Sequence, residues 1–239
     1  MPLTPNWKVL PHGPITQLEE NLWTVTGSFD IPFNPLKRVM TIVRREDGKL
    51  VLHGLMALDE KTQGQVEALG EVAYLVVPSG FHRLDAGRYR TRYPHAQMLA
   101  PAGARSRVDK VAKVDATYDD YSPDETTSLV DVDGLGQREG ALVVKSKRGT
   151  TYVMNDALFN MPEHQPGLSG FVLKHVTQST GGPKVSRTAR IGLVTDRARY
   201  RAALEKIADT SGLLRVIVAH HVPVEGDVSS ALRGAAASL

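Results

Sequence analysis

The chain has 239 residues, of which 41% are hydrophobic and 23% charged, and 29 Lys and Arg against 26 Asp and Glu leave a formal net charge of +3. These proportions are typical of a globular protein and exclude collagen, a long coiled coil and wholesale disorder. So small a charge does not by itself indicate nucleic acid. Because there is no cysteine, disulfides, thiolate metal sites and a cysteine nucleophile are excluded, and a transition metal must be held mainly by nitrogen and oxygen ligands.

The amino-terminal residues 1–15 contain several prolines and predict an arm that lies on the surface. They have no continuous apolar segment of the kind found in a signal peptide. No apolar run approaches the roughly 18 residues that span a bilayer. We therefore expect a cytoplasmic protein with no membrane segment. Because no linker-like stretch divides the chain, we also expect a single domain over residues 1–239.

The first half of the sequence alternates strands and helices, which is typical of an α/β fold. An Asp-Gly pair at residues 47–48 separates two strand-forming runs and predicts a hairpin. The predicted strands cover residues 21–26, 39–44, 49–53, 72–77 and 97–100, and the predicted helices cover residues 57–69 and 82–93.

The second half begins with three short strands, which predict an antiparallel meander. The predicted strands cover residues 128–132, 141–145, 150–154 and 213–219, and the predicted helices cover residues 197–209 and 229–237. Residues 161–190 show weak periodicity and are too long for an ordinary connection. We expect this segment to be a lid, a binding loop or a mobile insertion.

Ionisable side chains follow several of the predicted strands, namely His53, His82, Asp156, His220 and His221. In open α/β sheets ligands bind at the carboxyl ends of strands, so several such residues together favour a metal or catalytic site. The alternative for each of them is a hydrogen-bonded loop residue or a helix cap. The remaining histidines are expected to be solvated surface side chains; they are His12, His95, His164 and His175.

Asp85 lies three residues after His82, within the predicted helix 82–93. Positions three apart share one face of a helix, so both side chains can point at one ion. This spacing adds Asp85 to the candidate ligands.

The order of these segments resembles the metallo-β-lactamase-like hydrolase superfamily, over about residues 17–232. The similarity lies in the strand-forming runs near residues 21–25, 40–44 and 49–53, and in the later strand that leads into Asn155 and Asp156. The resemblance implies a four-layer αββα sandwich, with two mixed sheets flanked by helices. It also implies metal ions at strand ends along one edge.

The metal motif of that family is H-x-H-x-D-H, and the matching segment here is Gly80-Phe-His82-Arg-Leu-Asp85. His82 keeps the second histidine of the motif, and Asp85 stands where the third would be. Gly80 replaces the first histidine, and Leu84 replaces the aspartate. The motif is therefore incomplete.

The later ligands of the family are also only partly present. Gln137 replaces the next histidine, whereas Asp156 matches the bridging aspartate and His220 the final histidine. A full two-metal site needs more nitrogen and carboxylate ligands than these. The resemblance implies instead one divalent metal ion, zinc, iron or manganese, held by His82, Asp85, Asp156 and His220.

The missing aspartate of the motif bears on catalysis. In the family it helps to orient or deprotonate the attacking water, which Leu84 cannot do. The candidates for this catalytic role are His53, Asp85 and His221. His53 can also serve as a ligand or as a partner of a ligand.

Three functions follow from these observations. The first is a hydrolase in which a water molecule acidified by one bound metal ion attacks an ester, lactone, thioester or phosphoester of a small molecule. The second is a non-catalytic descendant of the fold that binds a ligand or a protein partner. The third is a nucleic-acid binder using the arginines of residues 88–92 and 184–201, and we favour solvated helix faces over it.

Overall fold

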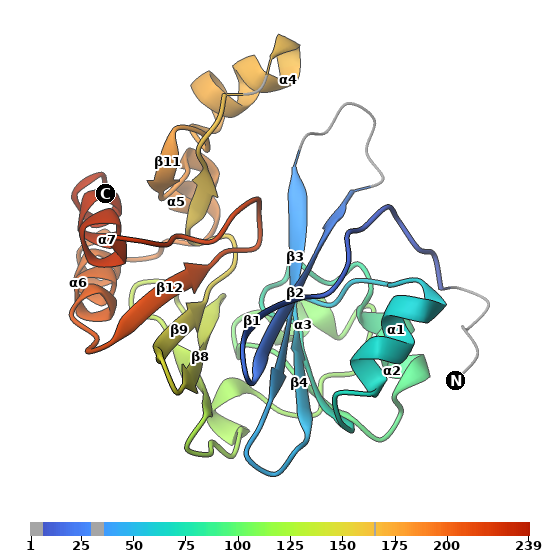
Figure 1. Ribbon diagram of the computed structural model, residues 1–239. Coiled ribbons are helices and arrows are strands. Elements are labelled where there is room, and N and C mark those ends of the chain that lie inside the picture. Colours follow the sequence, from blue (N-terminus) through green and yellow to red (C-terminus); the bar gives the residue numbers. More distant parts are fainter. Residues whose placement is uncertain (1–6, 30–35, 165) are drawn as a thin grey trace.

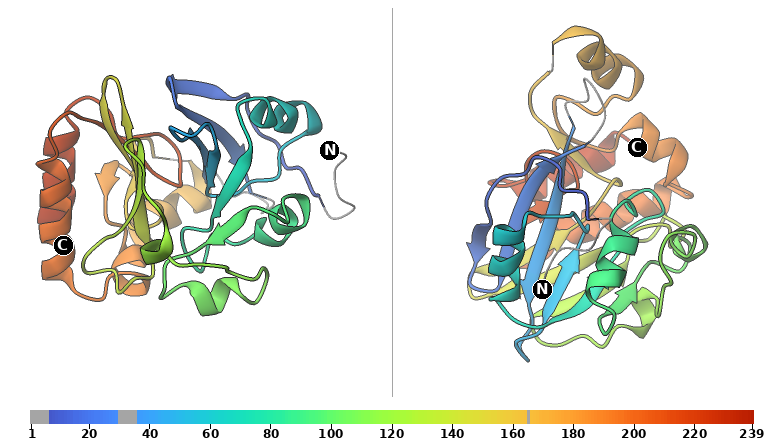
Figure 2. Two further views of the ribbon diagram at one scale, coloured as in Figure 1. Left: turned by 90° about the horizontal axis from the view of Figure 1, so that it is seen from below. Right: turned by 90° about the vertical axis from the view of Figure 1, so that its right-hand side faces the viewer.

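The computed structural model describes residues 7–29, 36–164 and 166–239. In this part of the chain two β-sheets lie face to face, and helices cover the outer face of each sheet (Figure 1). Seen from below, the layers follow one another as helices, sheet, sheet and helices (Figure 2). The predicted αββα sandwich is confirmed.

The first sheet is built from the amino-terminal half of the described chain. In spatial order its strands are β1 (Thr16–Glu19), β2 (Leu22–Ser28), β3 (Lys37–Arg44), β4 (Leu50–His53), β5 (Val72–Val76) and β6 (Gln97–Leu99). The strands from β1 to β4 are antiparallel neighbours, whereas β4, β5 and β6 run parallel. The carboxyl ends of β4 and β5 therefore lie at the same edge.

The second sheet comes from the carboxyl-terminal half. In spatial order its strands are β12 (Leu213–Ile217), β9 (Gly149–Val153), β8 (Gly140–Ser146) and β7 (Thr127–Asp131). The strands β12 and β9 are parallel, so their carboxyl ends also share an edge. A separate hairpin pairs β10 (Phe159–Met161) with β11 (Gly182–Lys184).

The helices fall into two sets along the chain. Those that follow strands of the first sheet are α1 (Glu60–Glu67), α2 (Ala86–Arg92) and α3 (Arg105–Val108). Those of the second half are α4 (Gly167–Phe171), α5 (Arg187–Gly192), α6 (Arg197–Ala208) and α7 (Val228–Ala237). Within the described residues, no helix has the length and apolar character needed to cross a bilayer.

Three layers of buried apolar side chains hold these elements together. Strand β3 contributes to two of these layers, because successive side chains of a strand point to opposite faces of the sheet. Its Met40 and Ile42 pack toward the helices of the first half, and Val43 packs toward the second sheet. On the far side, Leu204 of α6 and Leu232 of α7 pack against the second sheet.

Acidic caps fix where two helices begin. The side chain of Asp59 accepts the N–H of Thr62 at 2.7 Å, and Asp196 caps α6 in the same way. An N-cap residue has extended rather than helical backbone angles. For this reason α1 begins at Glu60, three residues after the predicted start of the helix.

The amino-terminal arm is not only a surface feature, which corrects the prediction for its described part. The side chain of Trp7 is buried in the helix-covered layer and donates its indole N–H to the carbonyl of Leu58 at 2.7 Å. His12, predicted to be solvated, has a side chain only 4% exposed. Its Nε2 accepts the N–H of Asp59 at 3.0 Å, so the arm supports the start of α1.

The segment 161–190, predicted as a lid or loop, contains short regular elements in its described residues. The hairpin of β10 and β11 carries α4 and a π-helical turn, Val172–Val176. In both Figure 1 and the right-hand view of Figure 2, α4 projects away from the two sheets. Weak periodicity thus reflects elements of three to six residues, not an absence of structure.

The arginines of residues 88–92 are not a solvated face, which corrects that expectation. Arg88, Arg90 and Arg92 pair with the carboxylates of Asp85, Asp115 and Glu67. These carboxylates already neutralise the basic side chains that a nucleic acid would need.

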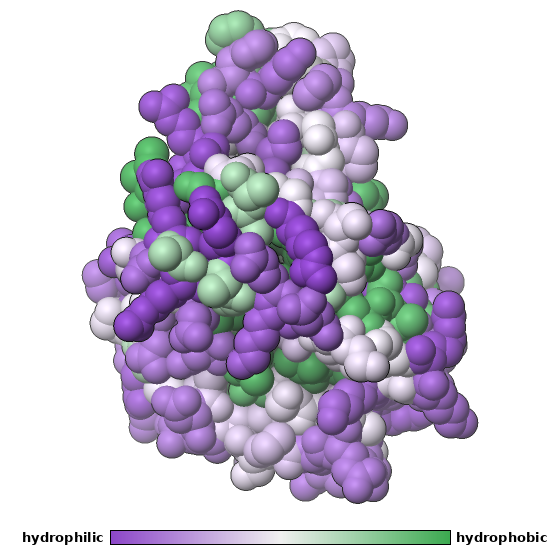
Figure 3. Space-filling model, turned by 90° about the vertical axis from the view of Figure 1, so that its left-hand side faces the viewer, coloured by the Kyte–Doolittle hydropathy of each residue, from purple (hydrophilic) through white to green (hydrophobic). Residues whose placement is uncertain are grey.

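The second arginine-rich stretch is different. Arg197, Arg199 and Arg201 on α6 are exposed, as expected of a solvated helix face. The side of the molecule that carries α6 and α7 is largely hydrophilic, with apolar residues in separate patches (Figure 3). The buried side of α6 carries instead Tyr200 and Leu204.

The layer between the two sheets is expected to carry much of the stability. Leu142 of β8 is fully buried there, so Leu142→Ala removes apolar contacts and leaves a cavity. We expect the free energy of unfolding to fall by about 2–5 kcal/mol in urea denaturation. The control Leu168→Ala, at a side chain 80% exposed, should change it by less than about 0.5 kcal/mol. Equal effects of the two substitutions would contradict this account of the core.

Candidate metal centre

Three side chains from separate loops bring their ligand atoms together. His82 follows β5, Asp156 follows β9, and His220 follows β12. His82 Nε2 and His220 Nε2 each lie 3.0 Å from the same oxygen, Asp156 Oδ1. All three ligand atoms lie within 4.8 Å of one another, which is close enough to hold one metal ion.

The carboxylate of Asp156 is the negative charge of this group. Burial raises its pKa, but the charges and hydrogen bonds of His82 and His220 outweigh this effect, so the pKa of Asp156 lies well below its usual range. The side chains of His82, Asp156 and His220 are 15%, 17% and 7% exposed. The carboxylate of Asp156 is thus ionised, and the three side chains are largely buried while remaining open to a small molecule.

His220 is held from two sides. Its Nδ1 lies 2.7 Å from the carbonyl oxygen of Lys37, and its ring stacks on Phe159 with centroids 5.1 Å apart. A carbonyl can only accept, so Nδ1 donates to Lys37. This leaves Nε2, the atom that faces Asp156, as the ring nitrogen that would bind a metal ion. This arrangement is the one found for metal-ligating histidines.

The loop of His82 is tied to the loop of Asp156. Ser79 Oγ accepts the N–H groups of Phe81 at 3.3 Å and His82 at 3.4 Å. The same oxygen accepts the side-chain amide of Asn155 at 3.4 Å. Both Ser79 and Asn155 are buried, so they join two loops that come from different sheets.

Glu139 holds the backbone of the Asp156 loop, and the sequence motifs did not identify it as a functional residue. Its fully buried carboxylate accepts the N–H groups of Asn155 at 2.9 Å, Asp156 at 3.0 Å and Ala157 at 2.9 Å. Burial and the charge of Asp156 raise the pKa of Glu139, and the three N–H donors oppose this rise. The only local signal was a carboxylate directly before an apolar strand.

Asp85 does not join the group, which corrects its prediction as a ligand and as a catalytic residue. It is fully buried before α2. Its Oδ2 accepts from Arg38 Nη1 at 2.7 Å, and its Oδ1 accepts from Arg88. Because α2 begins at Ala86, His82 and Asp85 do not share a helix face. Both oxygens of Asp85 are engaged in ion pairs.

His53 lies close to the group but contributes no ligand atom to it. It is fully buried at the end of β4, opposite Thr41 of β3. Burial, together with the charge of His82, lowers the pKa of His53 to about 3. Among the described residues, His53 Nε2 and Thr41 Oγ1 are buried without a hydrogen-bond partner. A neutral imidazole therefore stands beside His82.

His221 faces a different part of the molecule. Its backbone has a φ of 67°, and its side chain lines a cavity of about 190 Å³ together with Thr24, Val39 and Pro223. That cavity lies between the first sheet and β12, and none of the three ligand residues lines it. The structure thus gives no support to His221 as the group that activates water.

The residue types fit one metal ion and not two. Two imidazoles and one carboxylate are a ligand set found for catalytic zinc and for non-haem iron. At the positions where the family has further ligands, Gly80 has no side chain, Leu84 is 57% exposed, and Gln137 donates to Asp131. None of these can complete a second site.

Comparisons with known proteins agree with this fold. No family model matches the chain, and no curated protein sequence does. The metallo-β-lactamase FIM-1 from Pseudomonas aeruginosa, in its mono-zinc form, is 13% identical over 97% of both chains, with a TM-score of 0.62. VMB-1 is 8% identical over 97% of this chain and 99% of its own, with a TM-score of 0.64.

A third similar structure is a metallo-β-lactamase from Erythrobacter litoralis. It is 13% identical, over 94% of this chain and 96% of its own, with a TM-score of 0.63. Likeness at this level of identity concerns the fold. The chain has a metallo-β-lactamase-like fold.

Substitution of Glu139 should weaken the metal centre without touching a ligand. In Glu139→Gln an amide N–H₂ meets backbone N–H donors, so the loop of Asp156 loses part of its support. We expect zinc affinity to fall by about 10- to 100-fold in a competition titration with a chromophoric chelator. Glu125→Gln, at an exposed carboxylate away from this loop, is the matched control. Unchanged zinc affinity in folded Glu139→Gln would refute the positioning role.

His53 should make the protein sensitive to acid. Its pKa is about 3 in the folded chain and near 6.5 when unfolded, so the unfolded chain binds more protons between these values and stability is lost as the pH falls. With chelator present, the free energy of unfolding of the unsubstituted protein should fall between pH 7 and pH 5. In His53→Leu this fall should be smaller by about 2 kcal/mol.

Urea denaturation at both pH values measures this difference. His95→Leu, at an exposed histidine, should lose as much stability as the unsubstituted protein. An equal loss in His53→Leu would show that His53 does not titrate in this way.

Proposed function

We propose that the protein is a hydrolase that binds one divalent metal ion through His82, Asp156 and His220. Zinc, iron and manganese are the candidate ions. The substrate is a small molecule with an ester, lactone, thioester or phosphoester bond. The observation that carries the proposal is the convergence of three ligand atoms within 4.8 Å at strand ends of this fold.

If bound by His82, Asp156 and His220, a divalent ion would supply Lewis-acid chemistry for the attack of water on a carbonyl or phosphoryl group. The residues of the chain prepare the position for it. Asp156 provides an ionised carboxylate, and the carbonyl of Lys37 orients His220. Glu139 and Ser79 hold the loops of Asp156 and His82 in place.

Of the three candidate catalytic residues, only His53 is supported as part of this site, through its electrostatic interaction with His82. Its low pKa makes it a weak base near neutral pH. The neutral imidazole of His53 adds no positive charge near the centre, and this favours the binding of a cation. We propose no base from the side chains of the described residues, and we leave His53 as a neutral, buried neighbour of the centre.

The alternative function is a non-catalytic descendant of the fold that binds a ligand or partner. The absence of ligands at Gly80, Leu84 and Gln137 favours this alternative. It predicts no stoichiometric metal and no thermal shift with divalent ions. The two functions therefore differ in a measurable quantity.

Elemental analysis of protein purified without chelator, then incubated with zinc, manganese or iron, separates them. We expect about one ion per chain, lost in His82→Ala and in Asp156→Ala because each removes a ligand from a three-residue group. The same substitutions should reduce hydrolysis of nitrophenyl esters and phosphodiesters, thioesters and lactones to the uncatalysed rate. His95→Ala, at an exposed histidine, controls for the loss of an imidazole.

Metal without turnover on any substrate of this panel would support a binding protein. Turnover that persists in both ligand variants would remove the metal centre as the site of hydrolysis. No metal under any condition would demote the hydrolase and favour the alternative.

A further inference from the structure

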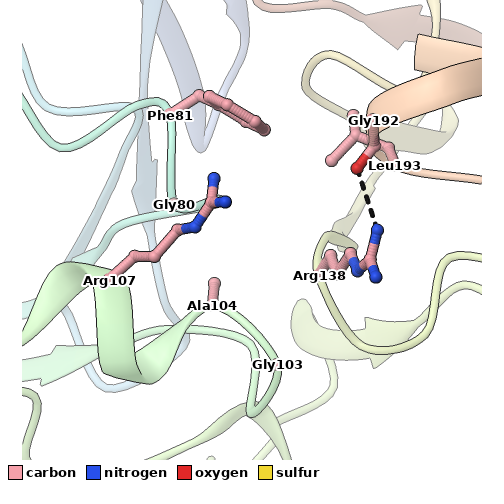
Figure 4. A pocket seen from close by; sticks show the side chains of 8 residues that line it. All are labelled: Gly80, Phe81, Gly103, Ala104, Arg107, Arg138, Gly192 and Leu193. Carbon is pink, nitrogen blue, oxygen red and sulfur yellow. Dashed lines mark hydrogen bonds between the residues drawn. The ribbon is translucent and has the colours of Figure 1, made fainter.

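A cavity of about 290 Å³ lies beside the metal centre. Its lining residues are Gly80, Phe81, Gly103, Ala104, Arg107, Arg138, Gly192 and Leu193 (Figure 4). One wall is the loop that leads directly into His82. Another wall is the loop of Arg138, which is followed by Glu139, the support of Asp156. The cavity is thus bounded by the two loops that position ligands.

Two guanidinium groups enter this cavity from opposite walls (Figure 4). Arg107 comes from α3 and lies over the ring of Phe81, with Cζ 5.1 Å from the ring centroid. Arg138 donates Nη1 to the carbonyl of Gly192 at 3.0 Å. A guanidinium has five N–H donors, so most of those on both arginines are available to a ligand.

The positive charge in the cavity has no protein counter-ion. None of the eight described residues that line it is acidic. Within the described chain, the contacts of the two guanidinium groups are with an aromatic ring and a carbonyl, and no carboxylate pairs with either. Elsewhere on this side of the fold, Arg88 and Arg90 do have carboxylate partners. The cavity thus holds two guanidinium groups that no carboxylate of the described residues neutralises.

The local backbone makes room for Arg107. A Cβ at Gly80 would lie 2.6 Å from Cδ of Arg107, so Arg107 occupies the space that a side chain at position 80 would fill. Position 80 is where the family has its first histidine ligand. Next to Arg138, the carbonyl of Gln137 accepts the N–H of Gly103 at 2.8 Å. Two of the three positions that lack family ligands, Gly80 and Gln137, are thus next to arginines of the cavity.

We propose that this cavity, the arginine cavity, binds an anionic group of the substrate, a carboxylate or a phosphate. The fork of a guanidinium matches the paired oxygens of both groups. The bond to be cleaved then lies toward His82, Asp156 and His220, while Phe81 offers an apolar surface to the rest of the substrate. The proposal deepens the proposed function, on which it rests, by naming an anionic substrate class.

Calorimetric titration with inorganic phosphate and with malonate tests the arginine cavity. Arg107→Met and Arg138→Met should each weaken binding of the preferred anion by about tenfold or more, because each removes charged hydrogen bonds. Lys110→Met is the matched control, since it removes the same charge from an exposed side chain outside the cavity. It should bind as tightly as the unsubstituted protein. The anion that binds more tightly distinguishes a phosphate from a carboxylate.

His82→Ala separates this proposal from the metal centre. Anion binding that persists in His82→Ala and is lost in both arginine variants supports the arginine cavity, whatever the metal analysis shows. Loss in His82→Ala with full binding in both arginine variants would overturn the proposal, because the anion would then sit at the metal centre. Absence of saturable binding of either anion would also overturn it. Both arginines are exposed, and far-ultraviolet circular dichroism confirms that each variant is folded.

Discussion

The carboxylate of Asp156 is the interaction on which the rest of the centre depends. It receives the imidazoles of His82 and His220 at one oxygen, so it joins the loop after β5 to the loop after β12. These loops belong to different sheets. A backbone hydrogen bond from the N–H of Val39 in β3 to the carbonyl of Ala219, at 2.9 Å, joins the same two halves next to His220. The charged side chain and this backbone hydrogen bond together hold the carboxyl-terminal edges of the two halves of the sandwich.

A second carboxyl group, that of Glu139, is buried next to Asp156, and this proximity is electrostatically unfavourable. Glu139 is fully buried beside Asp156, and two negative charges so placed oppose each other. Three backbone N–H groups offset part of this repulsion, and the imidazoles offset part of it from the other side. A bound cation would offset still more. The two buried carboxyl groups are therefore the feature of this centre that a cation would stabilise.

Much of the fold could be predicted from the sequence. The buried face of a strand or helix places apolar residues at a regular spacing, and this spacing can be recognised in the sequence. Strand ends also predicted His82, Asp156 and His220, which the structure brings together. The prediction for Asp85 required a helix that begins near His82, whereas Asp85 is bound by Arg38, 47 positions earlier in the chain. No local pattern reveals such a distant partner. The hydrophobic periodicity of a sequence also does not predict the direction of a side chain in a loop, as at His221.

The close approach of Arg107 to Gly80 also constrains which residue position 80 can carry. A histidine at position 80 cannot be accommodated while the stem of Arg107 lies 2.6 Å from where its Cβ would be. A side chain at position 80 would therefore require Arg107 to change its conformation or to be replaced by a shorter residue. The present conformation of Arg107 and a histidine at position 80 exclude each other, so this part of the fold accommodates either an arginine or a side chain at that position, and not both.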